Sequence, residues 1–309
     1  MKAVRIHEFG GPDVLSIDEI PVPVPAKDEV LIRVHATSVN PVDWKIREGQ
    51  RKEKFPSILP LTIGWDVSGV IEALGEKVGN FRIGDEVYGR PDPTKNGAYA
   101  EYIVVKANLV SIKPISIGHT EAAAVPLAGL TAWQGIFDHG LLKEGQKVLI
   151  HAAAGGVGSY AVQFAKNIGV HVIGTASDQN IDFLKRLGAD EVIDYNMENF
   201  EDRLSDIDLV LDTIGGDTQL KSINVLKPGG RIITTLAPEF LAEAKAKNVH
   251  LIGYMAQSIP EQLIKIAALI DNGKVKPIIQ TVYPLTDAKK AHIESEQGHT
   301  RGKIVLQVI

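Results

Sequence analysis

Two patterns of hydrophobic and polar residues divide the chain. Up to about residue 120, short apolar runs alternate with polar residues and are separated by Gly, Pro and Asn clusters, which is typical of short strands joined by turns. The predicted strands are residues 2–9, 28–39, 68–74, 84–89 and 98–105. This part of the chain is therefore expected to form a mostly antiparallel β domain.

From Gly145 onward, apolar strands alternate with amphipathic segments of helix length. This alternation is the pattern of a parallel, doubly wound α/β sheet. Helices are predicted at 157–168 and 180–187. Six strands are predicted, which is the number in a complete Rossmann domain: 147–151, 170–174, 191–194, 209–212, 231–235 and 249–254.

The C-terminal part is too short to form a third domain. It contains one amphipathic helix at 260–272 and two strand-like segments at 278–284 and 303–309. We expect this part to return and complete the first domain. The predicted division is 1–121 for the first part of the β domain, 122–260 for the Rossmann domain and 261–309 for the return.

Composition and charge narrow the class of protein. The 309 residues include 33 Lys and Arg against 38 Asp and Glu, a net charge of −5 that gives no basic footprint for nucleic acid. No apolar run approaches the roughly 18 residues of a membrane span, and the N-terminus lacks the apolar core of a secretory signal. We expect a cytoplasmic protein that binds neither membrane nor nucleic acid. Cysteine is absent, which removes disulfides, thiolate catalysis and Cys-containing metal sites.

The strongest local motif is a glycine-rich turn between a predicted strand and a predicted helix. Residues 152–158 read AAAGGVG, and such small residues let backbone N–H groups at a helix N-terminus approach a diphosphate closely. A glycine-rich turn can also serve only as a helix cap, but the strand and helix around it favour dinucleotide binding. The candidate cofactor-binding residues of this loop are Ala154, Gly155, Gly156, Val157 and Gly158.

The end of the second Rossmann strand bears on the choice of cofactor. Thr175 and Ser177 are small polar residues able to accept the 2′-phosphate of NADP, and no Arg or Lys stands beside them. Asp178 could bind the ribose hydroxyl of NAD, although an acidic residue capping the next helix is the simpler explanation. The sequence therefore favours NADPH and leaves NADH possible.

Several longer motifs resemble one known family. The segments SVNPVDWKIREG, VPLAGLTAWQ, GQKVLIHAAAGGVGSYAVQFAK, VLDTIGG and HTRGKIVL are spread over essentially the whole chain. Together they resemble the zinc-independent quinone oxidoreductases of the medium-chain dehydrogenase/reductase superfamily. The resemblance implies a GroES-like β domain made of both chain ends, an inserted Rossmann domain, and a cofactor in the cleft between them. It also suggests a homodimer that pairs the last Rossmann strand near residues 250–255.

The resemblance also implies the absence of a metal. Where zinc alcohol dehydrogenases have a Cys ligand and a Gly-His-Glu motif, this chain has Val39-Asn40 and Gly64-Trp65-Asp66. Without a metal to polarise an alcohol, hydride donation to an electron-poor quinone or α,β-unsaturated carbonyl suits the site better. The implied activity is NADPH-dependent quinone or enone reduction without flavin or metal.

The resemblance assigns candidate roles to four further residues. Asn40 would lie beside the nicotinamide, where its amide can donate to a substrate oxygen, although Asn40-Pro41 could simply form a turn. Asp43 could contact substrate or only order its loop. Thr131 would lie near the nicotinamide or begin a helix, and Tyr195 near the adenosine phosphate.

Two further segments leave details of the pocket and cofactor contacts open. Trp44-Lys45 stands where several relatives have a Tyr, which leaves the substrate pocket undefined. Arg301 and Lys303 belong to the C-terminal match, and solvated or structural roles are favoured over cofactor contact.

Two other functions compete with reductase activity. A dinucleotide-binding redox sensor or structural protein would bind NADP(H) without consuming it. Binding of RNA has only the Rossmann groove in its favour and is opposed by the acidic charge balance. Turnover with an acceptor separates the first alternative from the reductase.

Overall fold

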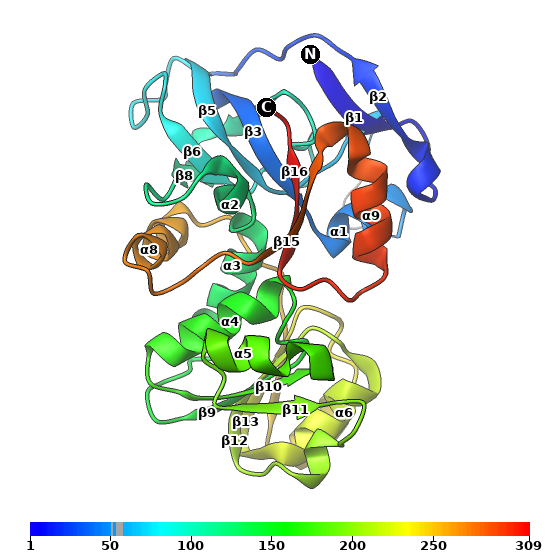
Figure 1. Cartoon of the computed structure of the whole chain (residues 1–309), viewed down its shortest axis with the longest axis vertical. Helices are drawn as coiled ribbons and strands as arrows, with labels where there is room; N and C mark the ends of the chain where they lie inside the picture. Colours follow the sequence, from blue (N-terminus) through cyan, green and yellow to red (C-terminus); the bar gives the residue numbers. More distant parts are fainter. Residues whose placement is uncertain (51, 54–57) are drawn as a thin grey trace. The chain divides into compact units, whose positions relative to one another are not determined.

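The chain forms two compact units, which Figure 1 shows. The computed structural model describes residues 1–50, 52–53 and 58–309. Contacts group Met1–Leu130 with Ser258–Ile309 as the first unit, and Thr131–Gln257 forms the second. The chain therefore leaves the first unit once and returns to it.

The first unit is built on a mostly antiparallel sheet of seven strands. Its order is β15-β16-β3-β5-β6-β8, and β7 also pairs with β3. The bounds are β3 (Glu29–Val39), β5 (Val67–Leu74), β6 (Glu86–Gly89), β7 (Tyr102–Lys106), β8 (Val110–Ile112), β15 (Ile279–Pro284) and β16 (Lys303–Gln307). The C-terminal strand β16 lies beside β3 (Figure 1), with Ile304 opposite Val39. The two chain ends thus share one sheet.

A smaller sheet and several short helices complete the first unit. The sheet has the order β2-β1-β4, with β1 (Lys2–Ile6), β2 (Leu15–Glu19) and β4 (Leu61–Thr62). The helices are α1 (Pro41–Arg47), α2 (His119–Ala123), α3 (Pro126–Trp133), α8 (Pro260–Asp271) and α9 (Ala288–Glu296), with single turns η1 (Pro12–Val14), η2 (Ala107–Leu109) and η6 (Leu285–Asp287). α3 crosses the boundary between the units.

The second unit is a parallel sheet of six strands in the order β11-β10-β9-β12-β13-β14. The strands are β9 (Lys147–Ile150), β10 (His171–Ala176), β11 (Glu191–Asp194), β12 (Ile207–Asp212), β13 (Leu226–Thr234) and β14 (His250–Gly253). The helices are α4 (Gly156–Asn167), α5 (Ile181–Leu187), α6 (Gly216–Val225) and α7 (Leu241–Ala246), with the π-helix η3 (Gln134–His139) and the single turns η4 (Asp178–Asn180) and η5 (Phe200–Asp202). The direction in which successive strands are added to the sheet reverses between β9 and β12. Such sheets bind ligands at this switch point, outside the carboxyl ends of the strands.

The apolar positions that predicted these elements form the cores. In the second unit, Leu149, Ile173 and Val210 come from three adjacent strands and pack in one buried cluster. In the first unit, Val30, Ile32 and Val34 of β3 are inaccessible and pack against β5 and β7. The predicted fold class, a mostly antiparallel β domain with an inserted Rossmann sheet, is confirmed.

One predicted strand is wrong over half its length. Residues 98–105 were expected to form a single strand, but β7 begins only at Tyr102. The backbone of Ala98 and Tyr99 instead donates to the carbonyls of Gly64 and Ile63, at 3.0 Å each. The alternation of residue types could not show this change of partner, because it does not identify the neighbouring chain segment.

Candidate functional site

The glycine loop joins β9 to α4 in the second unit. Its N-cap residue is Gly155, which has no side chain to satisfy the first N–H groups of the helix. Gly155, Gly156 and Val157 are partly exposed, whereas Ala154 and Gly158 are buried. The N-terminus of a twelve-residue helix therefore presents unpaired donors and the positive end of its dipole to an external anion.

Gly158 is fixed by close packing. A Cβ atom at this position would lie 2.4 Å from the carbonyl oxygen of Ala152 and 2.6 Å from the Cα of Ala153. Ala152 itself has a φ of +48°, a left-handed conformation that favours glycine. The turn thus has the geometry of a glycine-rich dinucleotide loop, although Ala stands at its first position.

A buried polar chain lies at the ends of β9 and β10. His151 Nδ1 is 3.1 Å from Thr175 Oγ1, and His151 Nε2 is 2.9 Å from Ser222 Oγ. Ser222 donates its proton to the carbonyl of Thr218, so it accepts from His151 Nε2–H, and Thr175 must donate to Nδ1. Burial lowers the pKa of His151 to about 4, which keeps the ring neutral. The hydroxyl proton of Thr175 is therefore engaged inside the unit.

Ser177 and Asp178 follow β10 directly. Ser177 is half-buried, and its hydroxyl oxygen accepts a hydrogen bond of 3.1 Å from Asn180 Nδ2, so its own proton can be donated elsewhere. Asp178 is exposed, and its carboxylate accepts the backbone N–H of Gln179 at 2.6 Å. Asp178 therefore lies in the first turn of η4, but this bond to the next residue is not a helix cap.

Tyr195 follows β11, the next strand in the sheet. Its backbone N–H donates to the carbonyl of Ala176 at 3.3 Å, and the residue is 53% exposed. The glycine loop, Ser177 and Tyr195 therefore follow three neighbouring parallel strands at one edge of the sheet. This edge collects the predicted cofactor-binding residues of the second unit.

Thr131 lies inside α3 rather than at its start, so the explanation as a helix-start residue is wrong. Its side chain is buried, and its carbonyl accepts a hydrogen bond of 2.6 Å from Tyr254. Its contact with a nicotinamide stays a prediction.

Asn40 and Asp43 come together where β3 leads into α1 in the first unit. Pro41 occupies the first helical position, where its missing N–H costs nothing. Asp43 Oδ2 accepts the backbone N–H of Asn40 at 2.8 Å and lies 3.4 Å from the hydroxyl of Tyr99. Asp43 is inaccessible, and its Oδ1 has no hydrogen-bond partner among the described residues. Burial, reinforced by the nearby Asp66, raises the pKa of Asp43 to about 7.

The side chain of Asn40 belongs to a second buried cluster. Its Nδ2 donates to Asp66 Oδ2 at 2.7 Å, and its Oδ1 accepts from the ammonium of Lys303 at 2.5 Å. Asp66 also accepts from Ser38 Oγ at 2.5 Å and from the backbone of Leu127 at 2.7 Å. Asn40 is therefore held firmly, with only 4% of its surface exposed.

A line of hydrogen-bonded side chains leads from Asp43 into α9. Tyr99 Oη is 3.2 Å from His292 Nε2, and His292 Nδ1 is 3.0 Å from the guanidinium of Arg47. Because Arg47 can only donate, His292 Nδ1 accepts, its Nε2–H donates to Tyr99, and Tyr99 donates to Asp43. Each residue of this line therefore donates to the next one in the direction of the Asp43 carboxyl group.

Sequence reasoning missed Asp66, Tyr99 and His292, and it underestimated Lys303. The one available signal was the position of Lys303 at the head of a predicted strand whose next three residues are apolar.

Comparisons with known proteins identify the family. The alcohol dehydrogenase GroES-like domain model matches residues 26–115, and the zinc-binding dehydrogenase model matches 187–306. The structure of the quinone oxidoreductase from Coxiella burnetii is 38% identical, covers 100% of this chain and 99% of its own, and superposes with a TM-score of 0.94. This chain belongs to the quinone oxidoreductases of the medium-chain dehydrogenase/reductase superfamily.

Two further relatives bear on the chemistry. The 2-methylene-furan-3-one reductase of Solanum lycopersicum is 36% identical over 100% of this chain and 79% of its own length. The Escherichia coli quinone oxidoreductase complexed with NADPH is 28% identical, with full coverage of both chains and a TM-score of 0.92. As a member of this family, the chain is an oxidoreductase that binds a nicotinamide cofactor.

The zinc implied by one family description does not fit the residues present. Within residues 1–50, 52–53 and 58–309, no three His, Cys, Asp or Glu side chains gather as a metal site. The oxygens that could serve, on Asn40 and Asp66, already bind the ammonium of Lys303.

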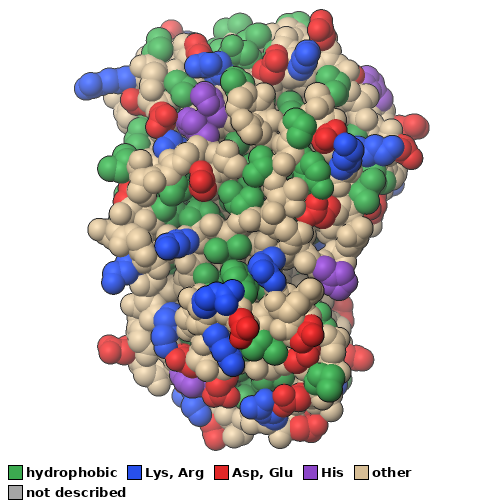
Figure 2. Space-filling view, in the orientation of Figure 1, with side chains coloured by type: hydrophobic (Ala, Val, Ile, Leu, Met, Phe, Trp, Pro, Cys, Tyr) green, Lys and Arg blue, Asp and Glu red, His purple; other side chains and the backbone are tan. Residues whose placement is uncertain are grey.

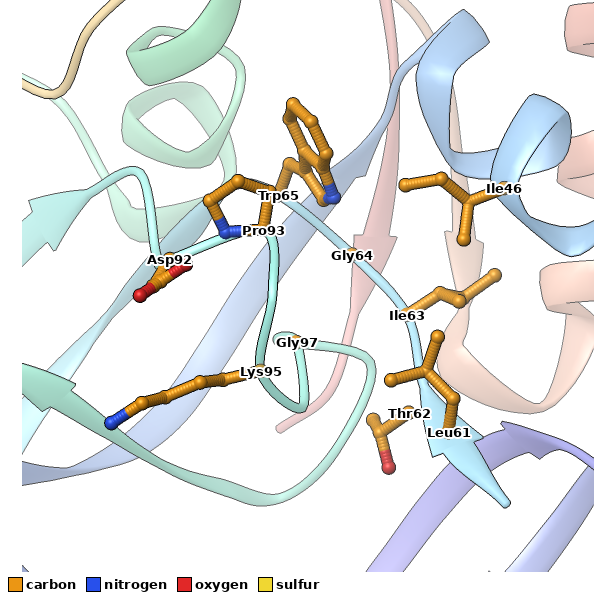
Figure 3. Close-up of a pocket in the computed structure, with 10 residues that line it drawn as sticks. All are labelled: Ile46, Leu61, Thr62, Ile63, Gly64, Trp65, Asp92, Pro93, Lys95 and Gly97. Atoms are coloured by element: carbon orange, nitrogen blue, oxygen red, sulfur yellow. The ribbon is translucent and has the colours of Figure 1, made fainter. Parts of the chain in front are cut away.

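A small cavity beside Trp65 does not offer an acceptor site. Figure 3 shows it in the first unit, lined by Ile46 of α1, by residues 61–65 and by residues around Pro93. Its volume is about 10 Å³, which is on the order of one water molecule and too small for a quinone ring. Lys95, at its edge, pairs with Glu29 at 3.1 Å.

The surface carries charges of both signs. Figure 2 shows basic and acidic side chains intermixed on the face in view. In the second unit, Lys166 pairs with Asp190 and Arg203 with Glu198. No helix in the described part of the chain is long and apolar enough to cross a bilayer.

Proposed function

We propose that the protein transfers hydride from NADPH to a quinone or an α,β-unsaturated carbonyl acceptor. The observation that carries this proposal is the uncapped N-terminus of α4, which follows the glycine loop at the switch point of the sheet. When bound, NADPH supplies the hydride. The chain's own residues bind the diphosphate at Gly155 to Gly158 and hold the acceptor oxygen through hydrogen bonds as negative charge develops on it.

Asn40 is proposed as the donor to that oxygen. One Nδ2 hydrogen is engaged by Asp66 at 2.7 Å, whereas the other has only a long contact of 3.5 Å with the carbonyl of Ser38. Because that contact is weak, the second N–H can donate to the acceptor oxygen instead. This hydrogen bond would strengthen as the oxygen becomes an enolate or phenolate. Asp43, whose pKa is raised to about 7, is proposed as a supporting residue of this site. Thr131 is proposed to contact the nicotinamide, and water supplies the final proton.

NADPH is proposed over NADH because Ser177 has a donor to offer a 2′-phosphate, whereas Asp178 lies one residue further on, in the first turn of η4. The deciding experiment is steady-state oxidation of NADPH and of NADH with a panel of quinones and short enones. Ser177→Ala should reduce the preference for NADPH without changing the acceptor ranking. Tight NADPH binding with no turnover on any acceptor would instead support the redox sensor or structural protein.

A homodimer is proposed through the edge strand β14, which pairs only with β13 within the described chain. An exposed strand edge is a ready surface for a second copy. Sedimentation at micromolar concentration should give the mass of two chains, and a single-chain mass would reject the dimer. Cytoplasmic location stays a prediction of the sequence, as does the absence of nucleic-acid binding.

A further inference from the structure

Lys303 is a buried lysine at the head of β16. Its side chain is 4% exposed, and its ammonium donates to the carbonyl of Val39 at 2.9 Å and to Asn40 Oδ1 at 2.5 Å. Asp66 Oδ2 lies 3.5 Å away. The β16–β3 register, with Ile304 opposite Val39, brings Lys303 to this position.

The three contacts define the charge of Lys303 and the orientation of Asn40. Two of the three neighbouring atoms, the carbonyl oxygen of Val39 and Asp66 Oδ2, are oxygens whichever way the Asn40 amide is turned, and the ammonium form of Nζ can donate to both. An ammonium cannot accept a hydrogen bond, so the Asn40 atom beside it must be Oδ1 and not Nδ2. The ammonium thereby turns the Asn40 amide so that Nδ2 faces Asp66.

A carboxylate, an amide oxygen and a backbone carbonyl are also the ligands that hard metal cations take. Here they converge on a cation that is covalently part of the chain. The remaining oxygen of Asp66 is already used by the backbone of Leu127. A metal ion at this point would have to displace a buried lysine and would face its positive charge.

We propose that Lys303 is the built-in cation of this site: its ammonium occupies the space among Val39, Asn40 and Asp66 that a metal ion would need, and it orients the Asn40 amide. The second part rests on the proposed function, because it makes Lys303 a positioning residue for the donor to the acceptor oxygen. The first part stands on the contacts alone.

The first test measures stability and needs no substrate. Lys303→Met removes the cation that donates to Asp66 and leaves only the more distant charge of Arg90, so we expect a lower melting temperature. Asp66→Asn should recover part of that loss in the double variant, because it removes the uncompensated charge. The matched control is Lys113→Met, which removes another buried lysine, one that donates to the carbonyls of Pro114 and Ile117. In the Lys113→Met background, Asp66→Asn should not raise the melting temperature.

The same preparations test the exclusion of metal. Wild-type protein purified in the presence of zinc should contain far less than one zinc per chain, and a chelator should not change its melting temperature. One tightly held zinc per chain, or no recovery by Asp66→Asn in the Lys303→Met background, would overturn the built-in cation.

The second test addresses positioning. Once wild-type turnover is established, Lys303→Ala should reduce kcat at least tenfold while its affinity for NADPH stays within twofold of wild type. Methylammonium chloride should restore part of that kcat, and sodium chloride at equal ionic strength should not. Lys113→Met should keep the wild-type kcat.

Wild-type kcat in Lys303→Ala, or equal effects of the two salts, would reject the positioning role. If the wild type turns over no acceptor, the proposed function fails while the stability and zinc measurements still decide the first part.

Discussion

The buried carboxyl of Asp43 should make the stability of the first unit depend on pH in an unusual direction. Its pKa rises from 3.8 in a model peptide to about 7 in the fold, chiefly because burial disfavours the charged form. Between these two pH values the folded chain holds a proton that the unfolded chain has lost. Stability attributable to Asp43 therefore falls as pH rises from about 4 to about 7.

The magnitude follows from the two pKa values. At about 1.4 kcal/mol for each pH unit between them, the fully ionised carboxylate costs about 4 kcal/mol, of which roughly 3 kcal/mol develops between pH 5 and pH 8. A domain of this size shifts its melting temperature by about 2–4 °C per kcal/mol. Asp43 should therefore lower the melting temperature by on the order of 6–12 °C across that interval.

The perturbation is Asp43→Asn, which cannot ionise and keeps an oxygen for the N–H of Asn40 and the hydroxyl of Tyr99. The wild-type curve alone is ambiguous, because the buried His151 and His292 have lowered pKa values, about 4 and about 3, and destabilise the fold as pH falls. The difference between variant and wild type removes their contribution. We expect the variant to gain stability relative to wild type steadily from pH 5 to pH 8.

The assay is thermal unfolding at half-unit pH steps, followed by fluorescence. Asp92→Asn is the matched control, because the pKa of Asp92 is lowered by its hydrogen bonds to Thr94, although burial opposes this, so it stays ionised throughout the interval. Its curve should run parallel to that of wild type. If the Asp43→Asn curve also runs parallel to wild type, Asp43 is ionised in the fold and the reasoning is refuted.

Three further predictions concern the second unit. Gly158→Ala forces a Cβ to within 2.4 Å of a backbone oxygen and should lower both stability and NADPH affinity, the latter measured by fluorescence titration. In Gly155→Ala the nearest atom to the new Cβ is 3.3 Å away, so both losses should be small, and equal losses in the two variants would contradict the packing argument. Ala152→Gly relieves a left-handed conformation and should raise stability by about 0.5–1 kcal/mol, and a loss in denaturant unfolding would count against it. His151→Asn should remove roughly 3 kcal/mol of acid destabilisation between pH 6.5 and pH 4, and an unchanged acid limb in thermal unfolding would show that His151 is not buried neutral.

The fold was predictable where a local pattern determines the structure. The strands β9 and β12 are short apolar runs, and the helices α4 and α8 have apolar residues at helical spacing, so both could be placed from the sequence. The segment 98–105 failed because Ala98 and Tyr99 pair with residues 63 and 64 instead of continuing β7. Alternation tells which side chains turn inward but does not identify the neighbouring chain segment.

The same limit separates the two halves of the candidate site. The glycine loop lies within a few consecutive residues, so its turn, its small side chains and its helix could be recognised together. The cluster around Asn40 joins residues 26 and 263 positions away, Asp66 and Lys303. Lys303 reaches it only because β16 pairs with β3 in one register, and a shift by one residue would turn its side chain to the opposite face. A lysine for which the sequence favours only a solvated or structural role thus becomes the cation of a buried site through strand register, which is a tertiary property. For this reason the partners that hold Asn40 in the first unit are visible only in the structure, whereas the glycine loop of the second unit could be recognised from the sequence.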